Sequence, residues 1–590
     1  GLATDLAIFQ SSLTAGQTAE GRRVVEALER LKLPDEAAMG PRELACWHEN
    51  KKTIVNSLRT LSSQIYSATA RVVYELIQNA DDCNFADDGR LRQLHLECGD
   101  DALVSYHNEQ GFQPRDLYAM CQVGESSKLA GSGKIGRKGI GFKSVFQITD
   151  RPLIISPPFR FCFDTPSRGT FGYIVPSWVD APEERVPPRH HALLRRLCAH
   201  GDDGVDNAND TGQDDDSAAN SGGGSGGGGG GTLLVCPLTA RVRGADLLRE
   251  FGFDGLSLAF LKNLQKISLI SHGAASAGGG GVGGEAGGGA GGGDGGGGTG
   301  GGAAAATTTT QEYRVERTVV FEHGPDDEGQ AHSGGFGGAM LRGVSVVSHQ
   351  LSHCAIVESV AHGAAAATET RREYRLHKYT IKQYRASGAA VAAAAAAASS
   401  SSSAAPLSAT TTISLAFPVS ADLAPQRSAH GELIFAFLPV TAAGFGFALH
   451  ADFELVASRQ EVSDSHSANH VLLARVPKLF VHAVLSDPAL GEEAFAAFLP
   501  DTEAVRRDNR SGGGRKWHTL ALALHHETSA FMMVPTEDAP EKVRRKHATL
   551  RPPHLSTRLV PNSLLKAATA GEMHFAHAAA VADLCLQSCL

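Results

Sequence analysis

The segment Arg71–Cys83, with the sequence RVVYELIQNADDC, opens the most informative region of the chain. Its apolar side chains recur at the spacing of one helical face, so we expect an amphipathic helix. These side chains are Val72, Val73, Leu76, Ile77 and Ala80. Glu75, Asn79 and Asp82 fall at positions i, i+4 and i+7, which places three polar side chains on a common face. Such a face is more often solvated than functional, so the helix alone indicates no activity.

A second segment, Ile135–Phe146 (IGRKGIGFKSVF), has glycines at positions 136, 139 and 141. A backbone with this spacing can approach oxygen anions closely, and residues 142–146 are expected to begin a helix whose free N–H groups face those anions. The spacing differs from the dinucleotide fingerprint Gly-x-Gly-x-x-Gly, and the Gly-Lys-Ser/Thr ending of a P-loop is missing. Residues 123–134 before it form a Gly- and Ser-rich loop with Lys128 and Lys134.

Between these segments, Leu103–His107 has the composition of a strand and runs into Asn108-Glu-Gln-Gly-Phe112. By itself this is an ordinary exit from a strand into a loop, and it carries no functional meaning.

Four short patterns occur in one order along the chain. They are Glu75-x-x-x-Asn79-Ala-x-Asp82, Asn108-x-x-Gly-Phe112, Gly136-x-x-Gly139-x-Gly141-Phe-x-Ser144, and Gly231-Thr232 at the start of a strand. In order and approximate spacing they resemble the GHKL ATPases, the superfamily of gyrase-type topoisomerases, ninety-kilodalton heat-shock chaperones and sensor histidine kinases. The sequences of residues 75–82 and 136–150 are most similar to the sacsin and plant NO VEIN branch. The resemblance implies an α/β fold, a GHKL two-layer sandwich followed by a smaller α/β domain like the chaperone middle domain.

The resemblance also implies roles for the polar face of the first helix. Glu75 would be the general base that orients or deprotonates the water attacking the γ-phosphate of ATP. Asn79 would give an amide oxygen to Mg²⁺. Asp82 would lie near the nucleotide base or ribose.

The remaining nucleotide contacts implied by the resemblance come from the glycine segment and from one strand. The lid, residues 123–138, would close over ATP, and Lys128 and Lys143 are the candidate charge partners of the phosphates. Thr232 would hydrogen-bond the adenine region. The other residues expected at the nucleotide are Gly111, Ser127, Gly136, Gly139, Ile140, Gly141 and Phe142.

One pattern departs from the family. Relatives commonly have Asp-x-Gly-x-Gly where this chain has Asn108-Glu-Gln-Gly111-Phe112. We therefore expect Asn108 in the place of the adenine-reading carboxylate. An amide oxygen can still accept from the adenine amino group, but without the assistance of a charge.

A further similarity lies in the second half of the chain. Ser458-Arg459 resembles the Ser-Arg-Glu loop of the chaperone middle domain, with Gln460 as a departure. The resemblance implies that Arg459 reaches the γ-phosphate from another domain and couples hydrolysis to domain docking. A surface arginine at a strand end is an equally open alternative.

Length and composition indicate a multidomain chain with inserted low-complexity segments. With 590 residues, several domains are expected, and four stretches lack the apolar content for a core: residues 201–230, 273–311, 361–370 and 387–411. The expected division is a helical leader at 1–45, the ATPase domain at 46–270, a linker at 271–311, the second α/β domain at 312–465 and a mainly helical region at 466–590.

Charge and cysteine content limit the partners. Lys and Arg number 54 and Asp and Glu 63, so the net charge is −9, which makes nucleic acid an unlikely partner. Ten cysteines are scattered without a Cys-x-x-Cys pair, which favours a reducing compartment over a disulfide framework. No apolar run reaches the length of a membrane span, and the first residue, Gly1, suggests a fragment or a processed chain. Histidines 190 and 191 have no further ligands at metal-binding spacing.

The function expected from the sequence is Mg²⁺-dependent binding and slow hydrolysis of ATP, which drives a chaperone-like conformational change. The alternative is a nucleotide-binding scaffold or regulatory protein with little turnover. A sensor kinase ranks last because residues 20–65 offer only His48 as a phosphoacceptor. The expected partners are ATP, an unidentified protein client and a second copy in a homodimer, and the expected location is the nucleus or cytoplasm.

Overall fold

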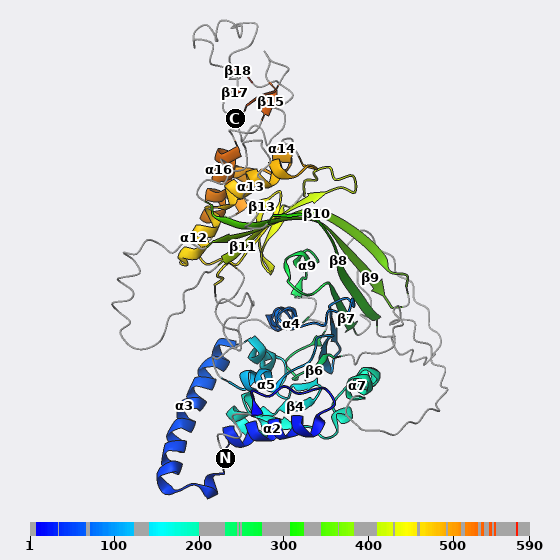
Figure 1. Ribbon diagram of the computed structural model, residues 1–590, viewed down its shortest axis with the longest axis vertical. Coiled ribbons are helices and arrows are strands. Elements are labelled where there is room, and N and C mark those ends of the chain that lie inside the picture. Colours follow the sequence, from blue (N-terminus) through cyan, green and yellow to red (C-terminus); the bar gives the residue numbers. More distant parts are fainter. Residues whose placement is uncertain are drawn as a thin grey trace, which may run out of the picture. The chain divides into compact units, whose positions relative to one another are not determined.

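The computed structural model describes most of the chain outside the low-complexity segments. The described residues are 8–33, 35–65, 71–122, 141–199, 230–244, 251–273, 307–323, 344–363, 365–382, 410–428, 431–456, 461–490, 494–508 and 514–528, with Leu247 and short strands nearer the C-terminus. They form two compact units (Figure 1). The first unit comprises Gly1–Gly252, Lys262–Tyr313 and Glu358–Glu369, and the second comprises Phe253–Leu261, Arg314–Val357 and Thr370–Leu590.

The first unit is built on a mixed sheet. Its strands are β1 (Gln93–Cys98), β2 (Ala102–His107), β3 (Leu153–Ser156), β4 (Phe159–Phe163), β5 (Pro176–Trp178), β6 (Thr232–Pro237) and β7 (Lys266–Gly273). They lie in the order β7-β1-β2-β6-β3-β4-β5. The pair β1 and β7 is parallel, and the other neighbouring pairs are antiparallel. The strand expected at residues 103–107 and the strand beginning at Thr232 are both confirmed.

Helices accompany this sheet. They are α2 (Thr18–Lys32), α3 (Pro41–Ile65), α4 (Arg71–Asp81), α5 (Pro114–Met120), α6 (Thr165–Arg168) and α7 (His191–Cys198), with the 3-10 turns η1 (Glu36–Ala38), η2 (Gly141–Gln147), η3 (Gly169–Tyr173), η4 (Pro182–Glu184) and η5 (Pro188–His190). Helix α2 packs against β4 and β5 (Figure 1). The helical spacing at residues 20–65 and the amphipathic helix at 71–83 are confirmed, because α2 and α3 cover most of the first range and α4 most of the second.

The two faces of β2 have different surroundings. Ala102, Val104 and Tyr106 belong to a hydrophobic cluster with side chains of β3, β6 and α7. Because successive residues of a strand point to opposite faces, Leu103, Ser105 and His107 point to the other face. All of these β2 side chains are buried.

The second unit combines long strands with C-terminal helices. Its strands include β11 (Thr410–Val419), β12 (Glu432–Ala436), β13 (Leu438–Phe445) and β14 (Ala448–Ala451), while β8 (Thr307–His323), β9 (Val346–His362) and β10 (Thr368–Lys382) have residues in both units. Strand β11 lies between β10 and β14, and β12 between β14 and β13. The strands expected around Tyr313, Ile413 and Leu433 are confirmed.

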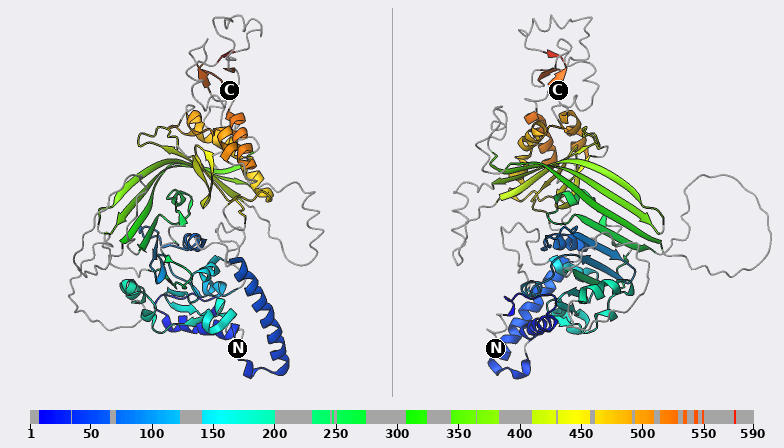
Figure 2. Two further views of the ribbon diagram at one scale, coloured as in Figure 1. Left: turned by 180° about the vertical axis from the view of Figure 1, so that it is seen from behind. Right: turned by 45° about the vertical axis from the view of Figure 1, so that its right-hand side comes forward.

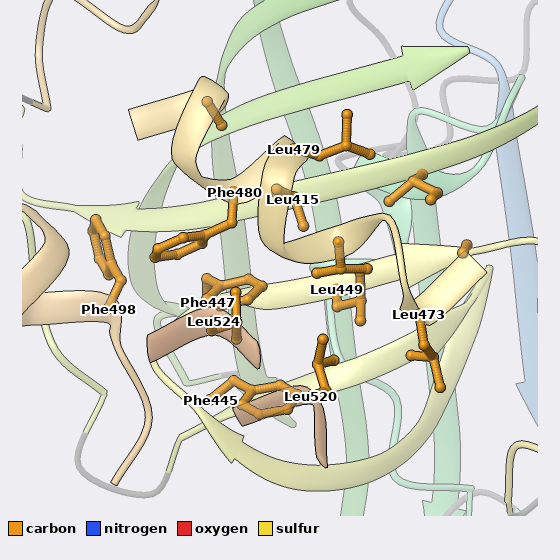
Figure 3. Packing of buried hydrophobic residues seen from close by; sticks show 14 of the residues in the cluster. Leu415, Phe445, Phe447, Leu449, Leu473, Leu479, Phe480, Phe498, Leu520 and Leu524 are labelled. Atoms are coloured by element: carbon orange, nitrogen blue, oxygen red, sulfur yellow. The ribbon is translucent and has the colours of Figure 1, made fainter. Parts of the chain in front are cut away.

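The C-terminal helices of the second unit cover one face of its strands. They are α12 (Ser467–Leu473), α13 (Val476–Ser486), α14 (Ala494–Phe498), α15 (Thr502–Asp508) and α16 (Arg515–Thr528). Helix α9 (Ser257–Phe260) lies on the opposite face, where Phe260 contacts the rings of Phe435 and His450. Figure 2 shows the orange C-terminal helices together on that face. Phe480 of α13 packs on Phe447, with ring centroids 4.9 Å apart, and Leu520 and Leu524 of α16 join the same core (Figure 3). The helical pattern expected at residues 471–484 is confirmed.

A buried ion pair ties this helical layer to the strands. Arg375 of β10 donates from Nε and Nη2 to the Asp487 carboxylate at 2.8 and 2.7 Å, just after α13. The His377 ring lies 3.1 Å from the same carboxylate. Burial alone would raise the pKa of Asp487, but the hydrogen bonds from His377 and Arg375 hold this pKa well below its usual range.

The mixed α/β class expected from the sequence is confirmed. Among the described residues, no helix combines the length and the hydropathy needed to cross a bilayer.

We expect Arg375→Met to lower the free energy of unfolding by about 3–5 kcal/mol, because it removes the arginine that compensates the buried Asp487 charge. Replacing both residues, as Arg375→Met with Asp487→Leu, should recover part of this loss. Chemical denaturation of the full chain measures both effects. The control is Arg314→Met, which breaks an ion pair with Glu316 whose side chains are 46% and 42% exposed and should cost less than about 1 kcal/mol. If Arg375→Met and Arg314→Met lower the free energy of unfolding equally, the Arg375–Asp487 pair does not stabilise the fold as a buried ion pair.

Candidate functional site

Helix α4 is fixed to the sheet by one buried carboxylate at its last residue. The Asp81 carboxylate accepts the backbone N–H groups of Lys262, Asn263 and Leu264 at 2.8–2.9 Å. These three residues lead into β7. The Asn263 side chain also donates to the carbonyl oxygens of Asp81 and Cys83. The C-terminal end of α4 and the loop after it are therefore held at one place on the sheet.

The polar face of α4 is largely enclosed. Glu75 is 3% exposed and Asp82 is 7% exposed, while Asn79 is half-buried. A polar helix face of this kind is usually solvated, but in this structure it is not. A buried carboxylate is costly unless its surroundings compensate it, so this face is a candidate site.

The segment that packs against α4 is η2, which directly follows the glycine-rich run. The helix start expected at residues 142–146 is present as this 3-10 turn, which Gly141 and Phe142 open. The Phe142 ring lies 5.8 Å from that of Phe163 in β4. Five expected residues of the nucleotide loop lie outside the described residues: Ser127, Lys128, Gly136, Gly139 and Ile140. The lid at 123–138 and Arg459 lie outside them as well.

Lys143 occupies a different place from the one expected. Its ammonium group donates to the carbonyl oxygens of Met120 and Tyr173 and lies 4.7 Å from the centre of the Phe163 ring. The side chain is buried, and burial lowers the pKa of Lys143 to about 8. These contacts make Lys143 a link between the end of α5 and η3. The expected role as a charge partner of the phosphates conflicts with this position.

Asn108 is also engaged by the protein. Its Oδ1 accepts the Gln93 N–H at 2.9 Å, and its Nδ2 donates to the Leu91 carbonyl oxygen at 2.8 Å. The oxygen and the nitrogen of the side-chain amide therefore both hold the backbone at the start of β1. The amide thus has a structural role, and its oxygen already accepts one hydrogen bond from the protein; the expected contact with the adenine amino group stays a prediction.

The residue after Asn108 supplies the buried carboxylate instead. Glu109 is 5% exposed, and the Thr232 hydroxyl donates to its Oε1 at 2.5 Å. Thr232 Oγ1 also lies 2.7 Å from Ser156 Oγ, which accepts the Phe112 N–H at 2.8 Å. Burial raises the pKa of Glu109 to about 7, against the lowering effect of the hydrogen bonds from Thr232 and Cys83. Thr232, expected at the adenine region, is thus joined to an acidic group.

Strand register brings these side chains together. His107 at the end of β2 is paired with Thr232 at the start of β6, so the next residues of the β2 exit lie beside the β6 entry. The Gln110 N–H donates to the Asn84 carbonyl oxygen at 2.9 Å, which joins this exit to the loop after α4. Gly111 has φ of +92°, and a Cβ there would lie 3.2 Å from the Pro157 carbonyl oxygen. The turn therefore favours glycine for backbone reasons.

Glu109 was not among the residues predicted for the site, although spacing indicates it. In Asp-x-Gly the carboxylate stands two positions before the glycine, and the residue two positions before Gly111 is Glu109. Cys83 and His107 were also missed as neighbours of this carboxylate. One potential ligand atom from each of Cys83, His107 and Glu109 lies within 4.8 Å of the other two.

Comparison with known proteins gives matches in this region. Residues 51–172 match the family model described as the sacsin domain. The chain is 35% identical over 158 residues to Protein NO VEIN of Arabidopsis thaliana, a match that covers 26% of this chain and 6% of that protein. It is 37% identical over 113 residues to Sacsin of Homo sapiens, covering 17% of this chain and 2% of that protein. The similarity to the sacsin and NO VEIN branch is confirmed for this region, and the chain spans a small part of the length of both relatives.

The buried ammonium of Lys143 predicts a specific pH dependence of stability. Its pKa in the folded protein, about 8, is lower than the roughly 10.4 of an unfolded lysine. Because the unfolded state binds the proton more tightly, stability rises as the pH increases through this window. The free energy of unfolding of the natural protein minus that of Lys143→Met should therefore increase by up to about 3 kcal/mol between pH 7.5 and 10.5.

Urea denaturation at several pH values measures this difference. The control is Lys52→Met, which replaces a lysine with a 73% exposed side chain on α3. Its difference from the natural protein should stay flat over the same pH range. A flat difference for Lys143→Met would show that this ammonium is solvated.

Proposed function

We propose that the first unit binds ATP with Mg²⁺ and hydrolyses it slowly, and that the useful output is a chaperone-like conformational change. The observation that carries the proposal is the buried Glu109 carboxylate, joined to Thr232 at the ends of adjacent strands beside the helix that holds Glu75. Similarity to the sacsin and NO VEIN branch over residues 51–172 supports the same site.

Glu109 and Thr232 fit the recognition of an adenine ring. A carboxylate accepts a hydrogen bond from an amino group, and such charge-assisted bonds are stronger than neutral ones. A donor from the ligand would stabilise the ionised form of Glu109, which burial disfavours. Thr232 fixes the orientation of the acceptor. In this proposal Glu109, rather than Asn108, reads the base, and Asp82 at the end of α4 lies near the ribose.

Glu75 and Asn79 fit the phosphate end of the same ligand. Both lie on α4, one helical turn apart, and they offer a carboxylate and an amide oxygen. Oxygen donors of this kind suit Mg²⁺, so Asn79 would hold the ion. The ion would neutralise phosphate charge when bound. Glu75 would orient the attacking water and accept its proton. Gly136, Gly139 and Gly141, with Ser127, Lys128, Ile140 and Phe142, are proposed to surround the phosphates.

The second unit would respond to the nucleotide in this proposal. Arg459 follows from the resemblance as the residue that contacts the γ-phosphate and couples hydrolysis to domain docking. A protein client, a homodimer and a nuclear or cytoplasmic location complete the proposal. The activities of the full-length relatives are not transferred, because this chain spans 6% and 2% of their lengths.

Calorimetry with ATP, with and without Mg²⁺, followed by a product assay on the same sample, tests the proposed function. Binding with slow release of phosphate supports the ATPase. Binding without product supports the alternative, a nucleotide-binding scaffold. No binding of ATP under either condition would overturn both.

Glu75→Gln should lower ATP turnover by about 100-fold or more, since general-base catalysis contributes factors of roughly 10² to 10⁴. Nucleotide affinity should change less than about threefold, because the proposed role lies in the reaction step. The control is Glu49→Gln, a change at an exposed glutamate on α3, which should leave both quantities unaltered. Unchanged turnover in Glu75→Gln would remove Glu75 as the base.

A second pair of variants tests which of Glu109 and Asn108 contacts the adenine. Glu109→Gln should weaken ATP binding by about tenfold or more, since a hydrogen bond to a charged group is worth roughly 1.5–3 kcal/mol. Asn108→Asp should give no gain in affinity, because this side chain bonds the backbone of residues 91 and 93. Tighter ATP binding by Asn108→Asp, together with no effect of Glu109→Gln, would return the base contact to position 108.

A further inference from the structure

Three side chains with metal-binding atoms meet at the end of β2. Cys83 comes from the loop after α4, His107 is the last residue of β2, and Glu109 follows in the strand exit. Each offers one ligand atom, and all three atoms lie within 4.8 Å of one another. Cys83 is far from His107 and Glu109 in the sequence. The fold brings the loop after α4 next to the exit of β2, and so brings these three side chains together.

The backbone around this cluster is fixed on both sides. The hydrogen bond from the Gln110 N–H to the Asn84 carbonyl oxygen joins the residues next to Glu109 and Cys83. His107 is held by its pairing with Thr232. The ligand atoms are therefore close because of main-chain contacts, and no rearrangement of the loops is needed to bring them together.

His107 has an unused ring nitrogen. Its side chain is 9% exposed, and Nδ1 has no hydrogen-bond partner among the residues that the structure describes. A neutral imidazole with a free lone pair is the form that binds metal ions. A buried polar atom without a partner also costs stability, and a bound ion would remove this cost.

Glu109 and Cys83 complete the set. The carboxylate is oriented by the Thr232 hydroxyl, and metal-binding carboxylates are commonly fixed in this way by a second residue. The Cys83 thiol donates to the Asn79 carbonyl oxygen at 3.1 Å and lies in hydrogen-bonding contact with Glu109. Cys83 is half-buried, which gives an ion a route from solvent. On binding, the metal replaces the thiol proton, which passes to solvent.

The combination of sulfur, nitrogen and oxygen donors selects a class of ion. Mg²⁺ and Ca²⁺ prefer oxygen ligands alone, whereas a thiolate with an imidazole suits Zn²⁺ and related ions. Tetrahedral zinc with bonds of about 2.0–2.3 Å places its ligand atoms roughly 3.5 Å apart. The three atoms lie within 4.8 Å of one another, so small side-chain rotations would bring them to the separations that one ion requires. Three protein ligands leave a fourth position for water or another molecule.

We propose that Cys83, His107 and Glu109 form a binding site for a zinc-class divalent cation in the first unit. The proposal uses the geometry and burial of these three side chains and does not rest on the proposed nucleotide function. Because both ligands would use the Glu109 carboxylate, a bound cation and the adenine amino group would compete for it. The simpler alternative is a hydrogen-bonded cluster that binds no metal.

Titration of the full chain with Co²⁺, in the absence of nucleotide, tests the site directly. We expect the near-ultraviolet thiolate band and the intense visible bands of four-coordinate cobalt, which Zn²⁺ should displace. Cys83→Ser should abolish the thiolate band and weaken Zn²⁺ binding on the order of 100-fold, since even changes in residues that orient a ligand cost 10- to 100-fold. Thr232→Val should weaken Zn²⁺ binding about tenfold for that reason.

The matched control is Cys198→Ser, at another half-buried cysteine of the same unit, at the end of α7. It should retain the cobalt spectrum and the Zn²⁺ affinity. His107→Gln should also abolish tight binding, and thermal unfolding of each metal-free variant verifies that it folds. A measurement on the natural protein avoids variants altogether: Zn²⁺ should slow alkylation of Cys83 by iodoacetamide but not that of Cys198, as followed by peptide mass spectrometry.

Absence of a thiolate–cobalt band in the natural protein, or Zn²⁺ binding by Cys83→Ser equal to that of Cys198→Ser, would overturn the proposal. So would equal alkylation of Cys83 with and without Zn²⁺. Because none of these measurements includes ATP, failure of the metal site leaves the nucleotide experiments unaffected.

Discussion

The buried Asp81 carboxylate, with its three backbone N–H donors, is the contact on which the candidate site depends. It fixes the C-terminal end of α4 to the residues before β7, and β7 pairs in parallel with β1. Burial raises the pKa of Asp81, while the three donors oppose that change. The direction of α4, and with it the places of Glu75, Asn79 and Cys83, follows from this attachment. Without it, an amphipathic helix could rotate or slide on an apolar surface at little cost.

Buried carboxylates in this protein are compensated in different ways, and the differences indicate their roles. Asp81 is compensated by backbone donors and Asp487 by an arginine, so both are suited to hold elements together. Glu109 has a hydroxyl group and a thiol as its neighbours, and burial raises its pKa to about 7. A carboxylate with such incomplete compensation gains most from a ligand that brings a donor or a positive charge. This incompletely compensated acid therefore lies where a ligand is proposed.

Local sequence patterns predicted the elements better than the contacts of single side chains. The spacing of Val72 to Ala80 predicted α4, and Thr232 was placed correctly at the start of a strand, because periodicity reports burial on one face. The contacts of Lys143 were not predicted because its partners, Met120 and Tyr173, are distant in sequence. The proximity of Cys83 to His107 depends on strand register and on a loop contact, which no local pattern contains. The burial of Glu109 next to Thr232 was not predicted either, because that contact joins residues 123 positions apart.

The hydrogen bond between Gln110 and Asn84 has a consequence for how such a site changes over evolutionary time. Both of its atoms belong to the main chain, so replacement of either side chain leaves the bond available, with proline at position 110 as the exception. The main-chain geometry therefore does not depend on which side chains the site carries. Lineages can exchange the reactive groups at positions 83, 107 and 109 while the geometry that presents them is preserved, which allows one architecture to be retuned for different small ligands.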